Sequence, residues 1–496
     1  MGLNSIIIFG GGTSGWLSAA YLVKHLPHIN ITLIEDTTLG PIGVGEGTQP
    51  ATAKFLHECG FDPDDWMKPS NAAFKHGVEL SGWNDDPYFV DNDSQEIYTA
   101  APGLNITSYF ANKPYSEYKK WFPAYTHAKE NLSPKLTPEL DINFNIGPEG
   151  FGAVHFNASD IIAVIKSKIL HKITYVDTKI THVESSIKGI EYLFDGARAY
   201  TADLYVDCSG FNSELLGNAL EVKYNSYKPW LLNDSAVAIV TQYTDPENEC
   251  HPYTKATTMN AGWRWTIPTY NRIGNGYVYS SDYITAEAAE QELREALNEW
   301  DAPAKHLKMK CGAHDSIAVK NVVAVGLSGG FVEPLEATGI TFTTAVITGL
   351  TNGLLYTNGE YNDEVKHGLN DHWRQLTNEI FSFVYAHYHY STRNDTPYWK
   401  AARHNLTDIP IGAKLTIEDH ASHYDKFIFY KHGSMFSSEQ WWNVIHASDN
   451  LTNKPTLTAK EQAYCEYMIE VQNKRQELAT QLFPNHYKFL KEWYND

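Results

Sequence analysis

The sequence has few cysteines and no long apolar run, and both shortages exclude classes of protein. Five cysteines are spread over 496 residues, and no two form a Cys-x-x-Cys motif. We therefore expect neither a disulfide framework nor a metal site, and a reducing compartment is the simplest one. No apolar stretch approaches the length of a membrane span, and no basic leader precedes the first apolar segment. These features predict a cytoplasmic protein.

Basic residues are also scarce relative to acidic ones. The chain has 39 Lys and Arg against 59 Asp and Glu, which gives a formal net charge of −20. An acidic surface repels phosphate backbones and anionic lipids, so we expect no nucleic-acid and no membrane partner. The aromatic content of 13% either packs a large core or lines a cavity for a flat ligand, and composition alone favours the core.

The beginning of the chain predicts a βαβ unit. Residues 6–9 form an apolar strand-like run, residues 10–15 are Gly-Gly-Gly-Thr-Ser-Gly, and residues 16–26 have helical spacing. A second apolar strand at residues 31–34 ends in Glu35, about 20 positions after the last glycine. A Gly-x-Gly-x-x-Gly turn followed by an acidic residue at this distance is typical of a dinucleotide site. The pattern does not choose between FAD and NAD.

Each glycine of this loop has a distinct purpose. Gly10 permits the tight turn, Gly12 lets the backbone approach a pyrophosphate, and Gly15 lets the helix pack closely on the strand. The helix N-terminus supplies free N–H groups and the positive end of the dipole. The cofactor-binding residues predicted here are Gly10, Gly11, Gly12, Thr13, Ser14, Gly15 and Glu35.

The rest of the chain changes character twice. Residues 322–325 form another apolar strand, which must join the first two strands in one sheet if all serve one nucleotide. We therefore expect an α/β domain over residues 1–350, made of segments that are distant in sequence. Within it, residues from about 85 to 150 are rich in Asn, Pro, Tyr and Asp and predict a lid-like insertion. Residues 351–496 are expected to be mainly helical.

Five motifs recur in order along the chain. They are Gly-Gly-Gly-Thr-Ser-Gly-Trp at 10–16, Val-Gly-Glu-Gly-Thr at 44–48, Asp-Cys-Ser-Gly-Phe at 207–211, Trp-Arg-Trp-Thr-Ile-Pro at 263–268 and Pro-Leu-Glu-Ala-Thr at 334–338. Together they resemble the flavin-dependent tryptophan halogenases, over residues 6 to about 400. The resemblance implies an FAD-binding, Rossmann-like α/β domain of the glutathione-reductase and aromatic-hydroxylase type, with a mainly helical substrate-binding module.

The same resemblance implies an activity and its partners. The expected enzyme is an FADH₂- and O₂-dependent halogenase that makes hypohalous acid from a halide co-substrate and halogenates a small, electron-rich, indole- or phenol-like ring. The sequence has no second Gly-x-Gly-x-x-Gly unit for NAD(P)H. The resemblance therefore implies a separate flavin reductase that supplies FADH₂ by diffusion.

The resemblance also assigns the catalytic residues. Lys75 stands in an Ala-Phe-Lys context before a strand-like run at residues 76–83, where the family has its essential lysine. Its ammonium can hydrogen-bond hypohalous acid, or its amine can form a haloamine. Glu336, expected close to Lys75 in the fold, can orient the halogen species or take the proton that the ring loses. Without the motifs, Lys75 would be an ordinary surface lysine and Glu336 an ordinary helix-start residue.

The remaining predicted site residues follow from the resemblance alone. Backbone N–H groups of Thr338 and Gly339 match the family's halide site, and amides at a helix start suit an anion. The further cofactor-binding residues are Gly45, Glu46, Leu327 and Ile340. Trp263 and Trp265 either wall off the flavin from the substrate or simply pack one face of a strand.

Two departures from the family affect the substrate. Position 337 is Ala where the tryptophan halogenases usually have Ser, so a hydroxyl near the proposed proton path is missing. The family's tyrosine-rich clamp for the amino acid backbone of tryptophan has no counterpart that we can align in the C-terminal third. The substrate is thus an indole, a phenol or another activated ring.

Two other functions remain compatible with the sequence. A flavin-dependent aromatic monooxygenase shares the fold and the oxygen chemistry, but needs its own route to NAD(P)H. A non-catalytic nucleotide-binding protein would keep the glycine loop and need neither Lys75 nor Glu336 in one cavity. A homo-oligomer also remains open.

Overall fold

The computed structural model describes residues 2–40, 45–92, 99–101, 104–136, 152–403, 406–422, 435–449, 454 and 456–495. The chain forms two compact units, each built from three separate stretches of sequence. The first contains Met1–Ala72, Phe156–Pro229 and Met309–Thr377, and the second contains Ala73–His155, Trp230–Lys308 and Asn378–Asp496. The functional division predicted at residue 350 stays a prediction, as does the lid at about 85–150, of which residues 93–98, 102–103 and 137–150 lie outside the described residues.

The first unit is organised around a six-stranded sheet with the strand order β10-β2-β1-β14-β23-β22. The central strand β1 (Ser5–Phe9) pairs in parallel with β2 (Asn30–Glu35) and β14 (Leu204–Asp207), and β14 pairs in parallel with β23 (Val322–Ala324). Strands buried on both faces of a parallel sheet are continuous apolar runs, as the three isoleucines of β1 are. This confirms that the first two strands share a sheet with residues 322–324.

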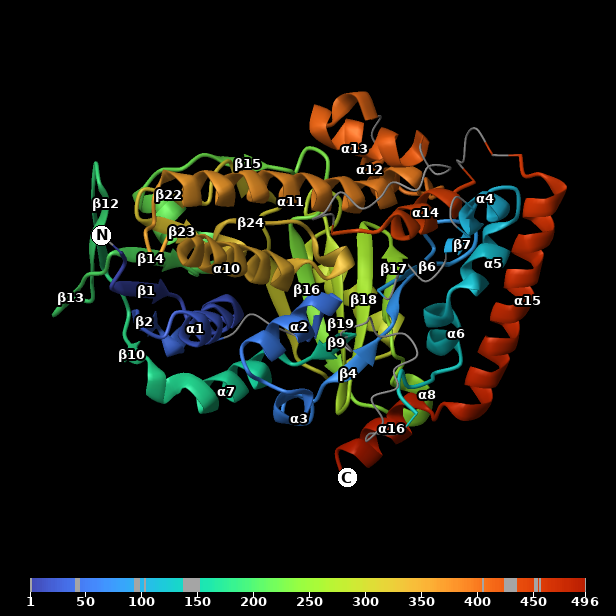
Figure 1. The fold of residues 1–496 in the computed structure, drawn as a ribbon, viewed down its shortest axis with the longest axis horizontal. Helices are drawn as coiled ribbons and strands as arrows, with labels where there is room; N and C mark the ends of the chain where they lie inside the picture. Colours follow the sequence, from blue (N-terminus) through green and yellow to red (C-terminus); the bar gives the residue numbers. More distant parts are fainter. Residues whose placement is uncertain are drawn as a thin grey trace. The chain divides into compact units, whose positions relative to one another are not determined.

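Helix α1 (Thr13–His25) packs on β1 and β2 of this sheet. It follows the glycine loop and contacts both α7 (Ala158–Ile169) and α10 (Gly339–Tyr356) (Figure 1). Its buried face includes Trp16, Leu17 and Leu22. The other elements of this unit are η1 (Thr37–Leu39), β3 (Glu46–Gly47), α2 (Pro50–Glu58), α3 (Pro63–Trp66), η4 (Leu170–Lys172), β10 (Thr174–Asp177), β11 (His182–Ser186), β12 (Gly189–Phe194), β13 (Ala199–Tyr200), η5 (Gly210–Asn212), the π-helix η6 (Glu214–Ala219), β15 (Tyr224–Ser226), β21 (Gly312–His314), β22 (Ala318–Val319), η7 (Gly326–Ser328), β24 (Gly330–Phe331) and η8 (Pro334–Glu336).

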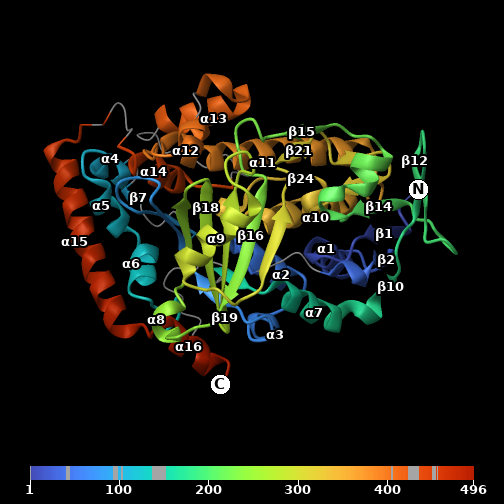
Figure 2. The same ribbon diagram turned by 180° about the vertical axis from the view of Figure 1, so that it is seen from behind.

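The second unit contains a seven-stranded, mostly antiparallel sheet with the order β20-β16-β19-β18-β17-β5-β6. Its strands are β20 (Ala304–Lys308), β16 (Ser235–Thr241), β19 (Arg272–Tyr279), β18 (Gly262–Thr269), β17 (Thr254–Met259), β5 (Gly77–Ser81) and β6 (Tyr88–Asp91). Helix α9 (Ala286–Leu297) packs on β16 and β19 (Figure 2), where Leu293 joins a buried cluster with Val237 and Tyr277.

Helices make up most of the rest of this unit. The long helix α11 (Asp363–Tyr390) begins in the first unit and ends in the second, and α15 (Ala459–Leu482) runs beside α4 (Ile106–Phe110) and α6 (Pro123–Lys129) (Figure 1). The remaining elements are β4 (Ala73–Lys75), β7 (Thr99–Ala101), β8 (Leu104–Asn105), α5 (Tyr115–Tyr118), η3 (Lys119–Trp121), β9 (Ala153–Phe156), α8 (Pro246–Glu249), α12 (Pro397–Ala402), η9 (Leu406–Asp408), α13 (Ile411–Ser422), α14 (Ser438–His446) and α16 (His486–Trp493).

The predicted fold class is confirmed, with an α/β part that contains the glycine loop and a mainly helical C-terminal part. Among the described residues, no helix combines the length and the apolarity needed to cross a membrane.

Close packing on β18 and β19 generates a prediction about stability. Trp265 lies opposite Gly276, and a Cβ added to Gly276 would lie 2.0 Å from Cζ2 of the indole. We expect Gly276→Ala to lower the free energy of unfolding by about 1–3 kcal/mol, because the ring must move. Urea denaturation checks this, and the same substitution in a Trp265→Val background should cost much less. Equal costs in both backgrounds would contradict the steric explanation.

Candidate active site

The glycine loop leaves room for a ligand at only one of its first three glycines. A Cβ on Gly10 (φ +119°) would lie 2.2 Å from the carbonyl oxygen of Cys208, and one on Gly11 would lie 1.7 Å from a carboxylate oxygen of Glu35. A Cβ on Gly12 would meet no atom of the described residues within 4 Å. Gly12 is also the N-cap of α1, without a side-chain cap. This open space at a helix N-terminus fits the pyrophosphate of FAD.

Glu35 is held by three protein donors at the end of β2. Its carboxylate accepts hydrogen bonds from Trp16 Nε1 at 3.0 Å, Lys166 Nζ at 2.6 Å and the Tyr175 hydroxyl at 2.6 Å. A carboxylate has about four acceptor positions, so one remains for a ribose hydroxyl. Burial and the contact with Glu35 raise the pKa of Tyr175, which keeps its hydroxyl a donor. Lys166 and Tyr175 were not predicted.

The Asp-Cys-Ser-Gly-Phe motif has a structural role. Asp207 is fully buried and accepts hydrogen bonds from the backbone N–H groups of Leu215 and Leu216, both at 2.9 Å. Its backbone carbonyl accepts a hydrogen bond from the Ser328 hydroxyl. Burial raises the pKa of Asp207, and the hydrogen bonds to its carboxylate oppose that shift. The motif thereby holds η6 and η7, and the predicted cofactor residue Leu327 lies in η7.

Glu336 and the predicted halide residues lie together before α10. Glu336 is 0% exposed, and its carbonyl oxygen accepts a hydrogen bond from Gln49 Nε2 at 2.7 Å. Thr338 is the N-cap of α10. The buried Thr338 hydroxyl has no hydrogen-bond partner among the described residues. A Cβ on Gly339 would meet nothing within 4 Å. A helix start with this open space and a hydroxyl free to donate fits a halide ion.

Four further predicted or divergent positions lie in the same unit. Ala337, which stands where the family has Ser, adopts the left-handed conformation with φ +54°. Ile340 lies in the first turn of α10 and is 6% exposed. Gly45 has a φ of +114°, a conformation that favours glycine. Burial raises the pKa of the adjacent Glu46 to about 7, so this carboxyl can hold a proton near neutral pH. Gln49 was not predicted, although it directly follows the Val-Gly-Glu-Gly-Thr motif.

Lys75 is 2% exposed and is the last residue of β4. It pairs with Ala153 of β9. Nearby, the His155 ring donates from Nδ1 to the Pro268 carbonyl at 2.9 Å and accepts at Nε2 from the Thr254 hydroxyl at 2.8 Å. Burial, followed by the charge of Lys75, holds the pKa of His155 well below its usual value. The imidazole therefore stays neutral and adds no second positive charge beside Lys75.

Lys75 lies in the second unit and Glu336 in the first. That they lie close together stays a prediction. Across the residues that the structure describes, no three His, Cys, Asp or Glu side chains are grouped to hold a metal ion.

The two signature tryptophans lie on one face of β18. Trp263 is 1% and Trp265 7% exposed, and their ring centroids are 6.4 Å apart. Trp265 Nε1 is buried and has no hydrogen-bond partner among the described residues. The strand-packing interpretation accounts for their burial, and the role of a wall beside the flavin stays a prediction.

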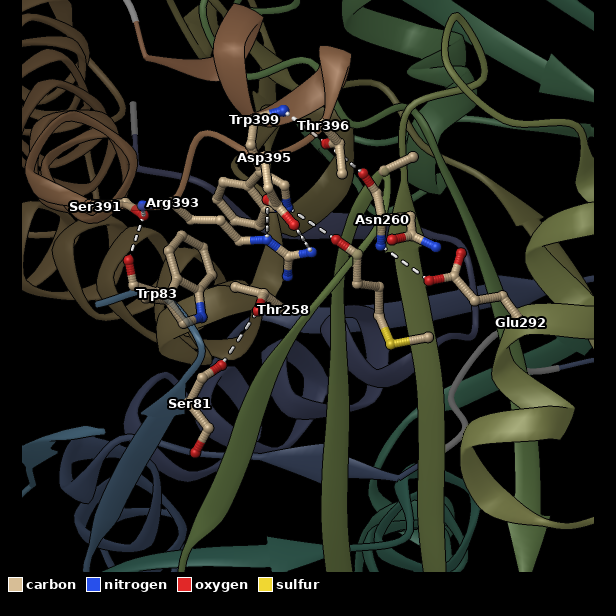
Figure 3. Close-up of polar contacts among 12 residues, drawn as sticks. Ser81, Trp83, Thr258, Asn260, Glu292, Ser391, Arg393, Asp395, Thr396 and Trp399 are labelled. Atoms are coloured by element: carbon tan, nitrogen blue, oxygen red, sulfur yellow. Dashed lines mark hydrogen bonds and ion pairs between the residues drawn. The ribbon is translucent and has the colours of Figure 1, made fainter. Parts of the chain in front are cut away.

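The segment after α11 is hydrogen-bonded to the residues that follow β5 (Figure 3). The Ser391 hydroxyl donates a hydrogen bond to the carbonyl of Trp83 at 2.5 Å. The Arg393 guanidinium lies 5.3 Å from the ring centroid of Trp399 and forms an ion pair with Asp395 at 2.8 Å. A shallow cavity of about 370 Å³ opens here, which the sequence did not predict. It is lined by Gly82, Asn84, Asp85, Thr258, Thr392, Arg393, Asn394 and Asp395.

The glycine loop predicts a selective loss of cofactor binding. Gly12→Ala adds a methyl group to empty space, so the free energy of unfolding should change by less than about 1 kcal/mol. The same methyl group would occupy the pyrophosphate position, and we expect FAD affinity to fall at least tenfold, measured by fluorescence titration. Gly10→Ala is the contrast, because it should lower stability and FAD affinity together. Unchanged FAD affinity in Gly12→Ala would exclude a pyrophosphate at this position.

Buried imidazoles in the second unit predict acid sensitivity. Burial, followed by the charge of His76, lowers the pKa of His127 to about 3, whereas unfolding restores a value near 6.5. The stabilisation is therefore complete above pH 6.5 and is lost as the pH falls toward 3. Between pH 7 and 5 one such histidine accounts for about 2 kcal/mol of lost stability. His127→Gln should reduce the loss measured by urea denaturation by about this amount, and an unchanged loss would contradict the assignment.

Comparisons with known proteins agree with this geometry. The model of the tryptophan halogenase family matches residues 5–463. Tryptophan 6-halogenase SttH from Streptomyces toxytricini is 32% identical over 422 residues, covering 80% of this chain and 80% of that protein. Tryptophan 7-halogenase RebH from Lentzea aerocolonigenes is 31% identical over 423 residues, covering 80% of this chain and 78% of that protein.

Solved structures show the same similarity over the whole fold. The crystal structure of a tryptophan halogenase from Shewanella frigidimarina superposes with a TM-score of 0.88 at 26% identity, covering 100% of this chain and 98% of that one. The structure of SttH superposes with a TM-score of 0.87 at 28% identity, covering 99% of each chain. Because the family model and relatives above 30% identity cover most of the sequence, the chain belongs to the tryptophan halogenase family of flavin-dependent halogenases, which use FAD and a halide ion.

Proposed function

We propose that this halogenase uses Lys75 to deliver hypohalous acid to an electron-rich ring, with indoles as the first substrate class. The observation that carries the proposal is the burial of Lys75, which is only 2% exposed on β4. A lysine is seldom fully buried, and buried titratable groups with charged or imidazole neighbours concentrate at functional sites. The neutral ring of His155 supports this environment, because it leaves the ammonium charge unopposed by a like charge.

The cofactor and the halide have separate binding residues in the first unit. Reduced FAD, when bound, supplies with O₂ the two-electron oxidation that converts halide into hypohalous acid. The open space at Gly12 receives the pyrophosphate, and the remaining acceptor position of Glu35 receives a ribose hydroxyl. The start of α10 at Thr338 and Gly339 holds the halide through backbone N–H groups. The Thr338 hydroxyl can add one further donor.

Lys75 and Glu336 have different roles in the reaction with the substrate. The Lys75 side chain holds the halogen, either through a hydrogen bond from its ammonium to hypohalous acid or as a haloamine. As the carbon–halogen bond forms, the ring carbon loses its proton to the Glu336 carboxylate. In the hydrogen-bonded route, the Lys75 ammonium gives a proton to the hydroxide that hypohalous acid releases, so water leaves, and the proton taken up by Glu336 is later returned to the amine. In the haloamine route, the amine and hypohalous acid form the haloamine and water, and after halogen transfer the nitrogen regains the equivalent of the proton that the ring loses. Ala337 has no hydroxyl that could assist the proton transfer, so we assign this step to Glu336.

The substrate proposal rests on relatives and on one departure from them. SttH and RebH are named for tryptophan, which supports an indole ring. The clamp for the amino acid backbone of free tryptophan has no recognisable counterpart in this sequence, which supports an indole other than free tryptophan, with phenols next.

We assign cofactor binding and catalysis to residues 1–350, with the segment from about 85 to 150 as a lid, and substrate binding to residues 351–496. A separate flavin reductase supplies FADH₂ in the cytoplasm, since the sequence has no second Gly-x-Gly-x-x-Gly unit.

A mass-spectrometric screen tests the activity. The protein, FAD, a flavin reductase, NADH and O₂ are combined with chloride, bromide or iodide and a panel of indoles and phenols. Halogen-shifted products support the proposal and reveal the halide and ring preferences together. Products that gain only one oxygen atom would instead identify an aromatic monooxygenase.

Lys75→Ala should abolish halogenation, because no side chain then holds the halogen near the ring, while FAD affinity stays within about twofold. The measurement is product per minute by mass spectrometry, beside a fluorescence titration with FAD. Lys308→Ala is the matched control, since Lys308 lies in the same unit and donates to the Ser235 hydroxyl at 2.9 Å. Near-normal turnover in Lys75→Ala would refute the role proposed for this lysine.

A further inference from the structure

The backbone that carries Lys75 is held from two sides. On one edge β4 pairs with β9, with Lys75 opposite Ala153. On the other edge the N–H of Phe74 donates to His486 Nε2 at 3.1 Å, and the N–H of His76 donates to the Pro252 carbonyl at 2.6 Å. The His486 imidazole therefore accepts a backbone hydrogen bond that a neighbouring strand would otherwise accept. The donor is Phe74, one residue before the proposed catalytic lysine.

His486 is a bridge with a fixed direction. Its Nδ1 donates to the carbonyl of Cys250 at 2.9 Å, which leaves Nε2 as the acceptor for the N–H of Phe74. Burial lowers the pKa of His486 to about 3, so the ring keeps this neutral tautomer at any working pH. The bridge links β4 to the segment that also supplies Pro252.

Helix α16 fixes the position of this imidazole. The N–H of His486 donates to the Asn131 carbonyl at 2.8 Å, and the Asn485 side chain caps the helix by accepting from the N–H of Lys488 at 3.2 Å. On the same helix, Trp493 stacks on Phe74 with ring centroids 5.8 Å apart and an interplanar angle of 14°. The α16 residues lie beyond residue 463, where the family model ends.

We propose that His486 is a positioning residue, which holds the backbone of β4 so that the Lys75 side chain meets the halogen and the ring in the correct geometry. The inference rests on the function proposed for Lys75. Loss of the imidazole leaves the buried N–H of Phe74 without an acceptor, which an edge strand can relieve by moving. A displacement of about 1 Å in a reacting group costs about a hundredfold in rate.

Two substitutions separate the bridge from the general packing of α16. The His486→Gln side chain can reach Phe74 and accept its N–H through Oε1, whereas His486→Asn keeps a donor for the Cys250 carbonyl but is too short to reach Phe74. We expect His486→Asn to lower kcat by about 10- to 100-fold, with KM for the ring and FAD affinity within about twofold. His486→Gln should recover kcat to within about threefold of the wild type.

The decisive readout is the amount of halogenated product per enzyme-bound FADH₂ in a single turnover, with folded enzyme in excess so that free FADH₂ does not consume O₂. A displaced Lys75 lets oxidant form without reaching the ring, so this ratio should fall in His486→Asn. Unfolded protein binds no FADH₂, so a loss of folded protein lowers product and bound FADH₂ together and leaves the ratio unchanged. His314→Leu in the other unit is the control for general destabilisation, since the buried His314 ring donates to the Val222 carbonyl at 2.9 Å. It should lower the melting temperature and keep the ratio.

Each outcome bears on one claim. A wild-type ratio and kcat in folded His486→Asn would overturn the positioning role, as would equal impairment of the Gln and Asn variants. If His486→Asn does not fold, the partly exposed Trp493→Leu provides the test, and a wild-type ratio there would overturn the role of the α16 clamp. Normal turnover in Lys75→Ala would instead refute the proposed function, whatever the His486 variants do.

Discussion

The α/β part depends on one constraint, which is that the first three residues of the glycine loop carry no side chains. The space that a Cβ would need at Gly10 belongs to the Cys208 carbonyl, and the space at Gly11 belongs to the Glu35 carboxylate. These approaches bring β1 against β14 and bring Glu35 under the loop, so the nucleotide-binding edge of the sheet is assembled by backbone packing. Gly12 is different, because among the described residues no atom lies within 4 Å of where its Cβ would be. The glycine at this position is therefore explained by the ligand that the loop is expected to bind and not by contacts within the described protein.

Buried charged side chains in the protein have two kinds of surroundings. Glu35 and Asp207 accept several hydrogen bonds from donors of the same unit, so their carboxylates are held in place. Lys75 is buried beside an imidazole whose pKa is lowered by burial and by the lysine itself. A neutral imidazole adds no like charge beside an ammonium group, so His155 contributes no second positive charge next to the lysine proposed to react.

The sequence predicted the parts of the fold that depend on local patterns. The apolar runs of β1, β2 and β23, the start of α10 near Thr338 and the glycine loop all follow from short-range periodicity and turn chemistry. The motifs also predicted Glu336 and Thr338 as neighbours, because they are two residues apart. The partners of these residues were missed for a physical reason. Lys166 meets Glu35 across 131 residues and His486 meets Phe74 across 412. A lone lysine or histidine on a helix carries no local signal of a distant partner.

Contacts with residues that are far away in the sequence explain how the lysine proposed to react is positioned. A three-residue strand such as β4 has too few backbone hydrogen bonds of its own to fix a side chain within the tolerance that halogen transfer requires. The structure compensates with contacts from the far end of the chain, through the His486 bridge and the stacking of Trp493 on Phe74. These contacts come from a helix beyond residue 463, where the match to the family model ends. The geometry of the lysine proposed to react therefore depends on residues of the second unit that lie outside the Ala-Phe-Lys motif.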